Sequence, residues 1–233
     1  MRNFSQQRGI SIISMMVGLT ISMIVVLAMM SLYKTTVKTT LESKSSAVKD
    51  GSRISAFLTV ESALQSAGYG VEYADAAALA GALFAFQKDG DDDFAAFDPT
   101  LIGTKSNAAL VWSWSSVSNG VAPTAADRCA ILFAPARGGL QYVASANCPT
   151  PGAPTAGGVE DAVANHAVWI VGPASPQVTI NVTPDAGCEP FGITTAPAGT
   201  VGGKFKVVLN TTNSNGIAVT STTCLANLHL AAA

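Results

Sequence analysis

An uncharged apolar segment near the N-terminus sets the first limit on how this chain can fold. Residues Ile10 to Leu32 form 23 consecutive positions without a charged side chain. As a helix rising about 1.5 Å per residue, this segment is roughly 34 Å long, enough to cross the apolar core of a bilayer. Arg2 and Arg8 precede it, without any acidic residue. Because positive charge stays on the cytoplasmic side, we expect a cytoplasmic N-terminus and an exported remainder.

The apolar segment differs from a secretory signal peptide. It exceeds the signal-peptide core of about 7–15 residues, and no small-x-small cleavage site ends it. Helical spacing of apolar residues continues from Ser31 to about Ala67 without a proline. The sequence therefore predicts a helix from Ile10 to Ala67, on the order of 85 Å long, with Gly51 as the position where it bends or loosens. A plain signal anchor is the alternative.

The residues at the start of the apolar segment resemble a known processing signal. Gln7-Arg8-Gly9, followed by the apolar run from Ile10 to Val17, is similar to the class III signal of type IV prepilins. The resemblance implies cleavage by a prepilin peptidase between Gly9 and Ile10, and N-methylation of the new amine at Ile10. The family usually has Phe at this position. A second match, Ala67-Gly68-Tyr69, is similar to the end of the long helix in minor pilins of the PilW type.

The resemblance covers roughly residues 6–70 and implies an order of regions along the chain. These are a cleaved leader (1–9), a transmembrane or filament-core helix (10–32), an amphipathic continuation (33–69) and a periplasmic or extracellular head (70–233). The implied location is the bacterial inner membrane, in a single pass, and then a cell-surface filament. The implied partners are other pilins, the prepilin peptidase, the inner-membrane assembly platform and, before assembly, the lipid bilayer.

Ser14 departs from the pilin pattern, which normally has Glu five residues into the mature chain. A carboxylate inside a bilayer is costly and seeks a partner. In the family, that partner is the N-terminal amine of the previously added subunit. Ser14 cannot form this ion pair. A subunit that enters first needs no such pair and can still offer the amine of Ile10 to the next subunit; the alternative is a subunit that docks by packing alone.

Small residues recur every four positions within the apolar segment, at Ser14, Gly18 and Ser22. A helix places residues with this spacing on one face. Small residues in such a stripe let another helix approach closely in lipid. We therefore expect the stripe to support helix packing, while a chance recurrence in a single-pass anchor is the alternative.

Beyond Tyr69 the apolar pattern changes to short runs separated by Gly, Pro, Asn and Ser. With no strong helical repeat between the runs, the pattern predicts an antiparallel β-sheet packed on the long helix, an α+β fold. Alanine-rich Asp75–Phe86 predicts a short helix, and Pro149–Gly158 and Pro184–Gly203 predict surface loops. The expected strands are Leu110–Ser115, Cys129–Pro135, Leu140–Ala144, Ala167–Gly172, Val178–Val182, Lys204–Leu209 and Ile217–Thr220.

All four cysteines lie beyond the apolar segment, and none belongs to a CxxC pair. With only two histidines in the chain, a zinc site is poorly supported, and two disulfides in an oxidising compartment are the better interpretation. Four cysteines allow three connectivities. Cys129–Cys148 and Cys188–Cys224 are favoured because each closes a local loop, but the sequence does not decide between the three.

An acidic cluster follows Lys88 and includes Asp89, Asp91 and Asp93. Oxygen-rich loops of this kind bind Ca²⁺ in some proteins. The EF-hand spacing is absent, since no Glu stands at the twelfth position from Asp89 or Asp91. A solvated turn is therefore favoured over a calcium site.

The rest of the sequence offers little support for catalysis or nucleic-acid binding. A net charge of −2 with 12% charged residues argues against a nucleic-acid partner. No G-x-S-x-G, HExxH or phosphate-loop motif occurs, and no nucleophile can be assigned to His166, five residues after Asp161. We expect no enzymatic activity and no cofactor. The expected function is that of a minor pilin or pseudopilin that primes or caps a filament; a tip adhesin and a signal-anchored periplasmic protein unrelated to pili are the alternatives.

Overall fold

The computed structural model divides the chain into two compact units, Met1–Val48 and Lys49–Ala233. Helix α1 contributes residues to both units. The residues that the structure describes are 11–71, 81–89, 93–105, 107–116, 126–148, 154–188 and 203–228.

Helix α1 runs without interruption over Ile12–Leu64, so the predicted long helix is confirmed, and it does not break at Gly51. Threonines after the apolar segment are compatible with the helix because their hydroxyls bond to its own backbone. Those of Thr36 and Thr40 donate to carbonyls four residues earlier, at 2.9 and 2.8 Å. Beyond the helix, Gly68 has a φ of 76°, and an added Cβ would collide with Leu228. Glycine is therefore required where the chain turns into the head.

The first sheet of unit Lys49–Ala233 is antiparallel, with the strand order β2-β1-β3-β4-β5-β6. The prediction of an antiparallel sheet and an α+β fold is thereby confirmed. The 3-10 helices η1 (Pro99–Thr104) and η2 (Ser145–Asn147) lie in its connections. The strands are β1 (Leu83–Lys88), β2 (Phe94–Phe97), β3 (Ala108–Trp114), β4 (Arg128–Ala134), β5 (Leu140–Val143) and β6 (Val168–Val171).

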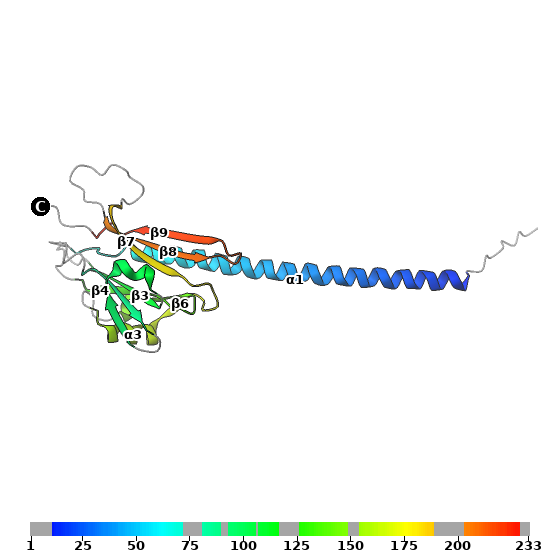
Figure 1. Ribbon diagram of the computed structural model, residues 1–233, viewed down its shortest axis with the longest axis horizontal. Helices are drawn as coiled ribbons and strands as arrows, with labels where there is room; N and C mark the ends of the chain where they lie inside the picture. The colour runs from blue at the N-terminus through cyan, green and yellow to red at the C-terminus, as the bar shows by residue number, and fades with distance from the viewer. Residues whose placement is uncertain are drawn as a thin grey trace, which may run out of the picture. The chain divides into compact units, whose positions relative to one another are not determined.

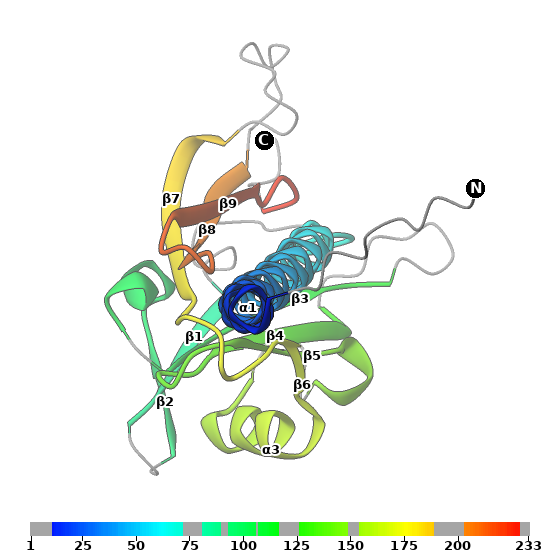
Figure 2. The same cartoon turned by 90° about the vertical axis from the view of Figure 1, so that its right-hand side faces the viewer.

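A second antiparallel sheet has the order β7-β8-β9. Its strands are β7 (Thr179–Cys188), β8 (Gly203–Thr212) and β9 (Ala218–Cys224). Figure 2 shows this sheet and the larger one on either side of the last turns of α1, and helix α3 (Ala156–His166) on the outer face of the larger sheet. Figure 1 gives the same elements from the side.

Two apolar clusters hold the head together, one on each face of the larger sheet. The first joins Val60 and Leu64 of α1, both 0% exposed, to Trp112 and Leu132 of that sheet and to Leu209 of the smaller sheet. Burying a large apolar side chain contributes about 1.5–3 kcal/mol. The last turns of α1 are therefore core elements of the head, and the second cluster packs the opposite sheet face against α3.

The short helix predicted over Asp75–Phe86 is wrong in its described part. Residues 83–86 belong to strand β1, and residues 75–80 lie outside the described residues. Alanine favours helix by intrinsic propensity. Tertiary packing overrides that preference here, because Ala85 enters the cluster facing α1 and Phe86 enters the cluster facing α3. Strands β1 and β2 were both missing from the sequence prediction.

The predicted loop Pro149–Gly158 is also wrong at its end, because α3 begins at Ala156. Thr155 caps this helix, and its hydroxyl accepts a hydrogen bond from the N–H of Gly158 at 3.2 Å. In the predicted loop Pro184–Gly203, Pro184 to Cys188 extend β7 and Gly203 begins β8, while residues 189–202 lie outside the described residues. Helix α3 lies between strands β5 and β6 in the chain, a region in which the sequence pattern predicts no helix.

Candidate functional site

The first 21 residues of α1 present an apolar surface that no other described part of the chain covers. Fifteen large apolar side chains from Ile12 to Leu32 are exposed, from 46% at Val25 to 78% at Ile12. The best 18-residue window has a mean hydropathy of 2.5, and none of it is buried. Among the described residues, this is the one helix long and apolar enough to cross a membrane.

The predicted packing stripe lies on this surface. Ser14, Gly18 and Ser22 all belong to α1 and are exposed. A Cβ added at Gly18 would meet no atom within 4 Å. The face that carries the stripe is therefore open to a partner helix at Gly18. The predicted processing residues Gly9 and Ile10 lie outside the described residues.

The head contains the first of the two favoured disulfides. Cys129 of β4 is bonded to Cys148, with 5.6 Å between the two Cα atoms. Cys129 is 1% exposed and belongs to the cluster beneath α3. Cys224 is also disulfide-bonded. The side chain of Cys188 lies outside the described ones, so the second pairing stays a prediction.

The acidic cluster follows strand β1 and precedes β2, whose register pairs Lys88 with Phe94. Asp89 and Asp93 are described, whereas Asp91 is not. Within the described ranges, no three His, Cys, Asp or Glu side chains are grouped to hold a metal ion. The calcium hypothesis therefore gains no support from the described part of this loop.

His166 lies exposed at the C-terminal end of α3. Asp161 of the same helix accepts a hydrogen bond from the side-chain amide of Asn165 at 2.7 Å. The structure thus pairs Asp161 with Asn165, and His166 remains without an assigned chemical role.

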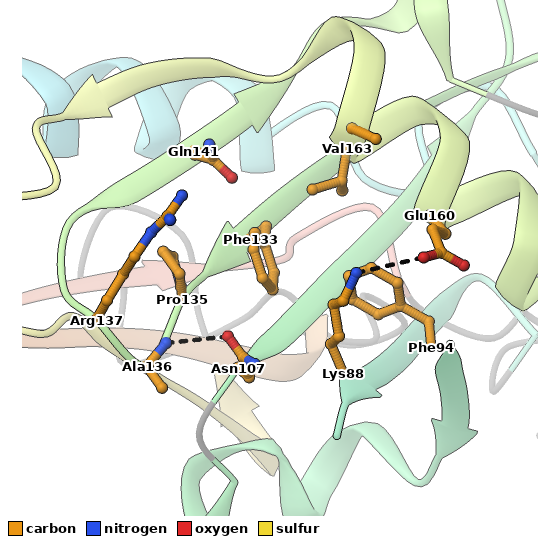
Figure 3. A pocket seen from close by; sticks show the side chains of 11 residues that line it. Lys88, Phe94, Asn107, Phe133, Pro135, Ala136, Arg137, Gln141, Glu160 and Val163 are labelled. Carbon is orange, nitrogen blue, oxygen red and sulfur yellow. Dashed lines mark hydrogen bonds and ion pairs between the residues drawn. The ribbon is translucent and has the colours of Figure 1, made fainter. Parts of the chain in front are cut away.

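Sequence reasoning missed a pocket of about 470 Å³ on the α3 side of the larger sheet. Figure 3 shows Phe133 in its centre, with Arg137 and Gln141 on one side and Lys88 and Glu160 on the other. Its lining comes from β1, β2, β4, β5, α3 and two turns. Residues so far apart along the chain form no local motif, so no sequence pattern signalled the pocket.

Two contacts set the charge distribution of this pocket. The ammonium of Lys88 lies 3.3 Å from a carboxylate oxygen of Glu160, so these two charges largely compensate each other. The guanidinium of Arg137 lies 5.4 Å from the ring centre of Trp169. Arg137 forms no ion pair with any described residue, which leaves the Arg137 side of the pocket positive.

In comparisons with known proteins, no family model, curated protein or solved structure matches this chain.

Proposed function

We propose that the chain is a structural subunit of a type IV pilus-like filament, a minor pilin or pseudopilin anchored in the inner membrane before assembly. One observation carries this proposal. A single unbroken helix, Ile12–Leu64, begins with a bare apolar surface and ends as a core element of the head. Such a helix serves as a membrane anchor and, after assembly, as the packing element among sister helices.

Transfer of the exposed apolar segment Ile12–Leu32 out of water is strongly favourable in free energy. Each large apolar side chain contributes about 1.5–3 kcal/mol on full burial, and fifteen such side chains are exposed between Ile12 and Leu32. They surround the helix on all sides, as in membrane spans and in the cores of large assemblies. Thr20 lies among them without a free hydroxyl, because it donates to the carbonyl of Val17 at 2.9 Å. The segment is therefore compatible with lipid and with a bundle of apolar helices.

The other end of α1 is fixed to both sheets of the head. The indole N–H of Trp112 in β3 donates to the carbonyl of Ala63 at 3.2 Å. Ser221 of β9 donates to the carboxylate of Glu61, and the Asn227 amide donates to the carbonyl of Gln65 at 2.8 Å. Bonds to two sheets hold the helix end firmly. This arrangement suits a subunit that carries its head at a defined place in a filament better than a flexible tether.

The processing signal and Ser14 refine the proposal. Cleavage between Gly9 and Ile10 by a prepilin peptidase leaves the apolar helix intact, with a methylated amine at its start. A subunit with Ser14 has no carboxylate to pair with an earlier subunit, so we assign it to the start of the filament. Its amine then pairs with the Glu of the next pilin at the assembly platform.

The matched variants Ser22→Leu and Ser31→Leu test the packing role. The two serines are nine residues apart on α1, which places them on opposite helix faces at 3.6 residues per turn. Both changes keep the segment apolar, so both variants should insert in the membrane. Ser22→Leu blocks close approach at the stripe and should lower recovery in the sheared filament fraction about tenfold, while Ser31→Leu should match the wild type. Equal recovery of the two variants would exclude the stripe as the packing face.

A further inference from the structure

The pocket beside α3 has the dimensions of a small-molecule site. Its volume of about 470 Å³ falls within the range of about 300–1,000 Å³ that such sites occupy. It lies entirely within the compact unit Lys49–Ala233. Within the described part of the head, the hydrogen bonds and apolar contacts that hold α1 involve none of the lining residues of the pocket. A role for this pocket is therefore separate from filament packing.

Arg137 gives the pocket a positive charge whose position is restrained by packing on Trp169. Its guanidinium stacks on Trp169, at 5.4 Å from the ring centre, so less side-chain freedom is lost when a ligand binds. Lys88 contributes little net charge because Glu160 pairs with it at 3.3 Å. The planar fork of an arginine matches a carboxylate through two parallel hydrogen bonds. The Arg137 end of the pocket is thus suited to an organic carboxylate.

The turn that carries Arg137 is fixed by its neighbours. Asn107 accepts a hydrogen bond from the N–H of Ala136 at 3.1 Å through its side-chain oxygen, as the dashed line in Figure 3 shows. Gly139 has a φ of 81°, and an added Cβ would lie 2.7 Å from the Trp169 ring. Only glycine lets that ring pack against the turn. The close approach of turn and ring places Trp169 under Arg137.

The remaining polar groups of the pocket favour an acceptor-rich ligand with hydroxyl groups. The side-chain NH₂ of Asn107 and the side-chain amide of Gln141 have no hydrogen-bond partner among the described residues, and both residues line the pocket. At the opposite end, Glu160 bonds to Lys88 through one oxygen and keeps acceptor capacity for a hydroxyl. Because Lys88 is already paired with Glu160, the lining residues offer no second uncompensated cation for a doubly charged anion such as phosphate.

We propose that this pocket binds a sugar acid of monosaccharide size, a hexuronate, free or as a residue of an acidic polysaccharide. Arg137 binds its carboxylate, Asn107 and Gln141 donate to its ring and hydroxyl oxygens, and Glu160 accepts from a hydroxyl. The uncompensated charge of Arg137 at one end of the pocket and the free acceptor of Glu160 at the other set the orientation of the ligand.

Saturation-transfer NMR with the full-length protein in detergent micelles tests this assignment, using sodium glucuronate as the probe. The expected result is a saturable signal with glucuronate, an affinity at least about tenfold lower for glucose, and no displacement by equimolar inorganic phosphate. Arg137→Gln should weaken glucuronate binding at least about tenfold, and Arg137→Lys should not restore it, because an ammonium lacks the planar fork.

Arg128→Gln is the matched control, because Arg128 is also exposed but does not line the pocket. It should bind like the wild type, and the melting temperatures of all variants should agree, since both arginines are at the surface. The proposal is overturned by absence of saturable binding, by equal binding of glucose, by displacement with phosphate, or by equal losses in the Arg128 and Arg137 variants. Ligand binding is measured on purified protein and does not depend on filament assembly. A negative binding result therefore leaves the filament proposal intact, and failure to find the protein in filaments leaves the binding proposal intact.

Discussion

The guanidinium of Arg53 lies 2.9 Å from the carboxylate of Asp50, one turn earlier on α1. The Arg53 side chain is only 3% exposed, whereas that of Asp50 is 27% exposed. Asp50 also accepts hydrogen bonds from the backbone N–H and the hydroxyl of Ser214, in the connection between β8 and β9, at 3.1 and 2.9 Å. Asp50 therefore joins a buried cation of the helix to the smaller sheet.

We expect Asp50→Asn to destabilise the head, because it leaves the buried guanidinium of Arg53 without a counter-charge. The amide oxygen of Asn can still accept from Ser214, so the change isolates the charge. Denaturant unfolding should give a lower midpoint for Asp50→Asn than for Ser214→Ala, which removes only a hydroxyl. Arg53→Met added to Asp50→Asn should recover part of the loss, and a further loss in the double variant would contradict the role of the pair.

The head should lose stability in acid below about pH 4. Hydrogen bonds hold the pKa of Asp50, Asp98 and Asp127 below the usual value of 3.8, and they come chiefly from the Ser214 hydroxyl, the Thr100 backbone N–H and the Ser116 hydroxyl respectively. Since the folded-state pKa is the lower one, the stabilisation is present above the unfolded pKa and lost as the pH falls through the folded pKa.

Unfolding midpoints measured from pH 7 to pH 2.5 check this expectation. Asp127→Asn should show a smaller decrease below pH 4 than the wild type, because one of the three linked protonations is removed. A midpoint that stays constant or rises between pH 4 and pH 2.5 would refute the linkage.

Two leucines of α1 provide a matched test of where the helix enters the core. Leu64 is fully buried, whereas Leu58 is 60% exposed. Leu64→Ala should lower the free energy of unfolding by about 2–5 kcal/mol, and Leu58→Ala should change it by no more than about 0.5 kcal/mol. Urea unfolding of both variants gives the comparison. Similar losses of stability at the two positions would contradict the finding that α1 turns Leu64, and not Leu58, toward the core of the head.

The Cys129–Cys148 disulfide should contribute about 3 kcal/mol, because it closes a loop with a sequence separation of 19 residues. Replacing both cysteines with alanine should lower the free energy of unfolding by that amount. Mass spectrometry of a non-reduced digest should recover the two cysteines in one linked pair of peptides. A peptide linking Cys129 to Cys188 or Cys224 would contradict the pairing.

The long helix was predictable from sequence because uninterrupted helical spacing and the lack of proline leave few alternatives. The expected strands at Cys129–Pro135 and Leu140–Ala144 agree closely with β4 and β5. Strand β1 was missed because its Leu-Phe-Ala-Phe run is buried on both faces, and such short runs lack the alternation that distinguishes strand from helix.

The pocket could not be predicted, because its chemistry depends on contacts between distant segments. Arg137 alone is an unremarkable surface cation. Its guanidinium is restrained because Trp169 of β6 packs beneath it, and that contact depends on Gly139. The burial of Arg53 was missed for the same reason, since Ser214, which binds its partner Asp50, comes 164 residues after Asp50 in the chain.

Mass spectrometry of the chain in sheared, purified filaments tests the central claim most directly. If α1 passes from the membrane into a filament, the protein should be recovered in the filament fraction at low copy number. Its first residue should be N-methylated Ile10, with residues 1–9 removed. Recovery only in the membrane fraction, as an uncleaved chain that still begins with Met1, would contradict the account.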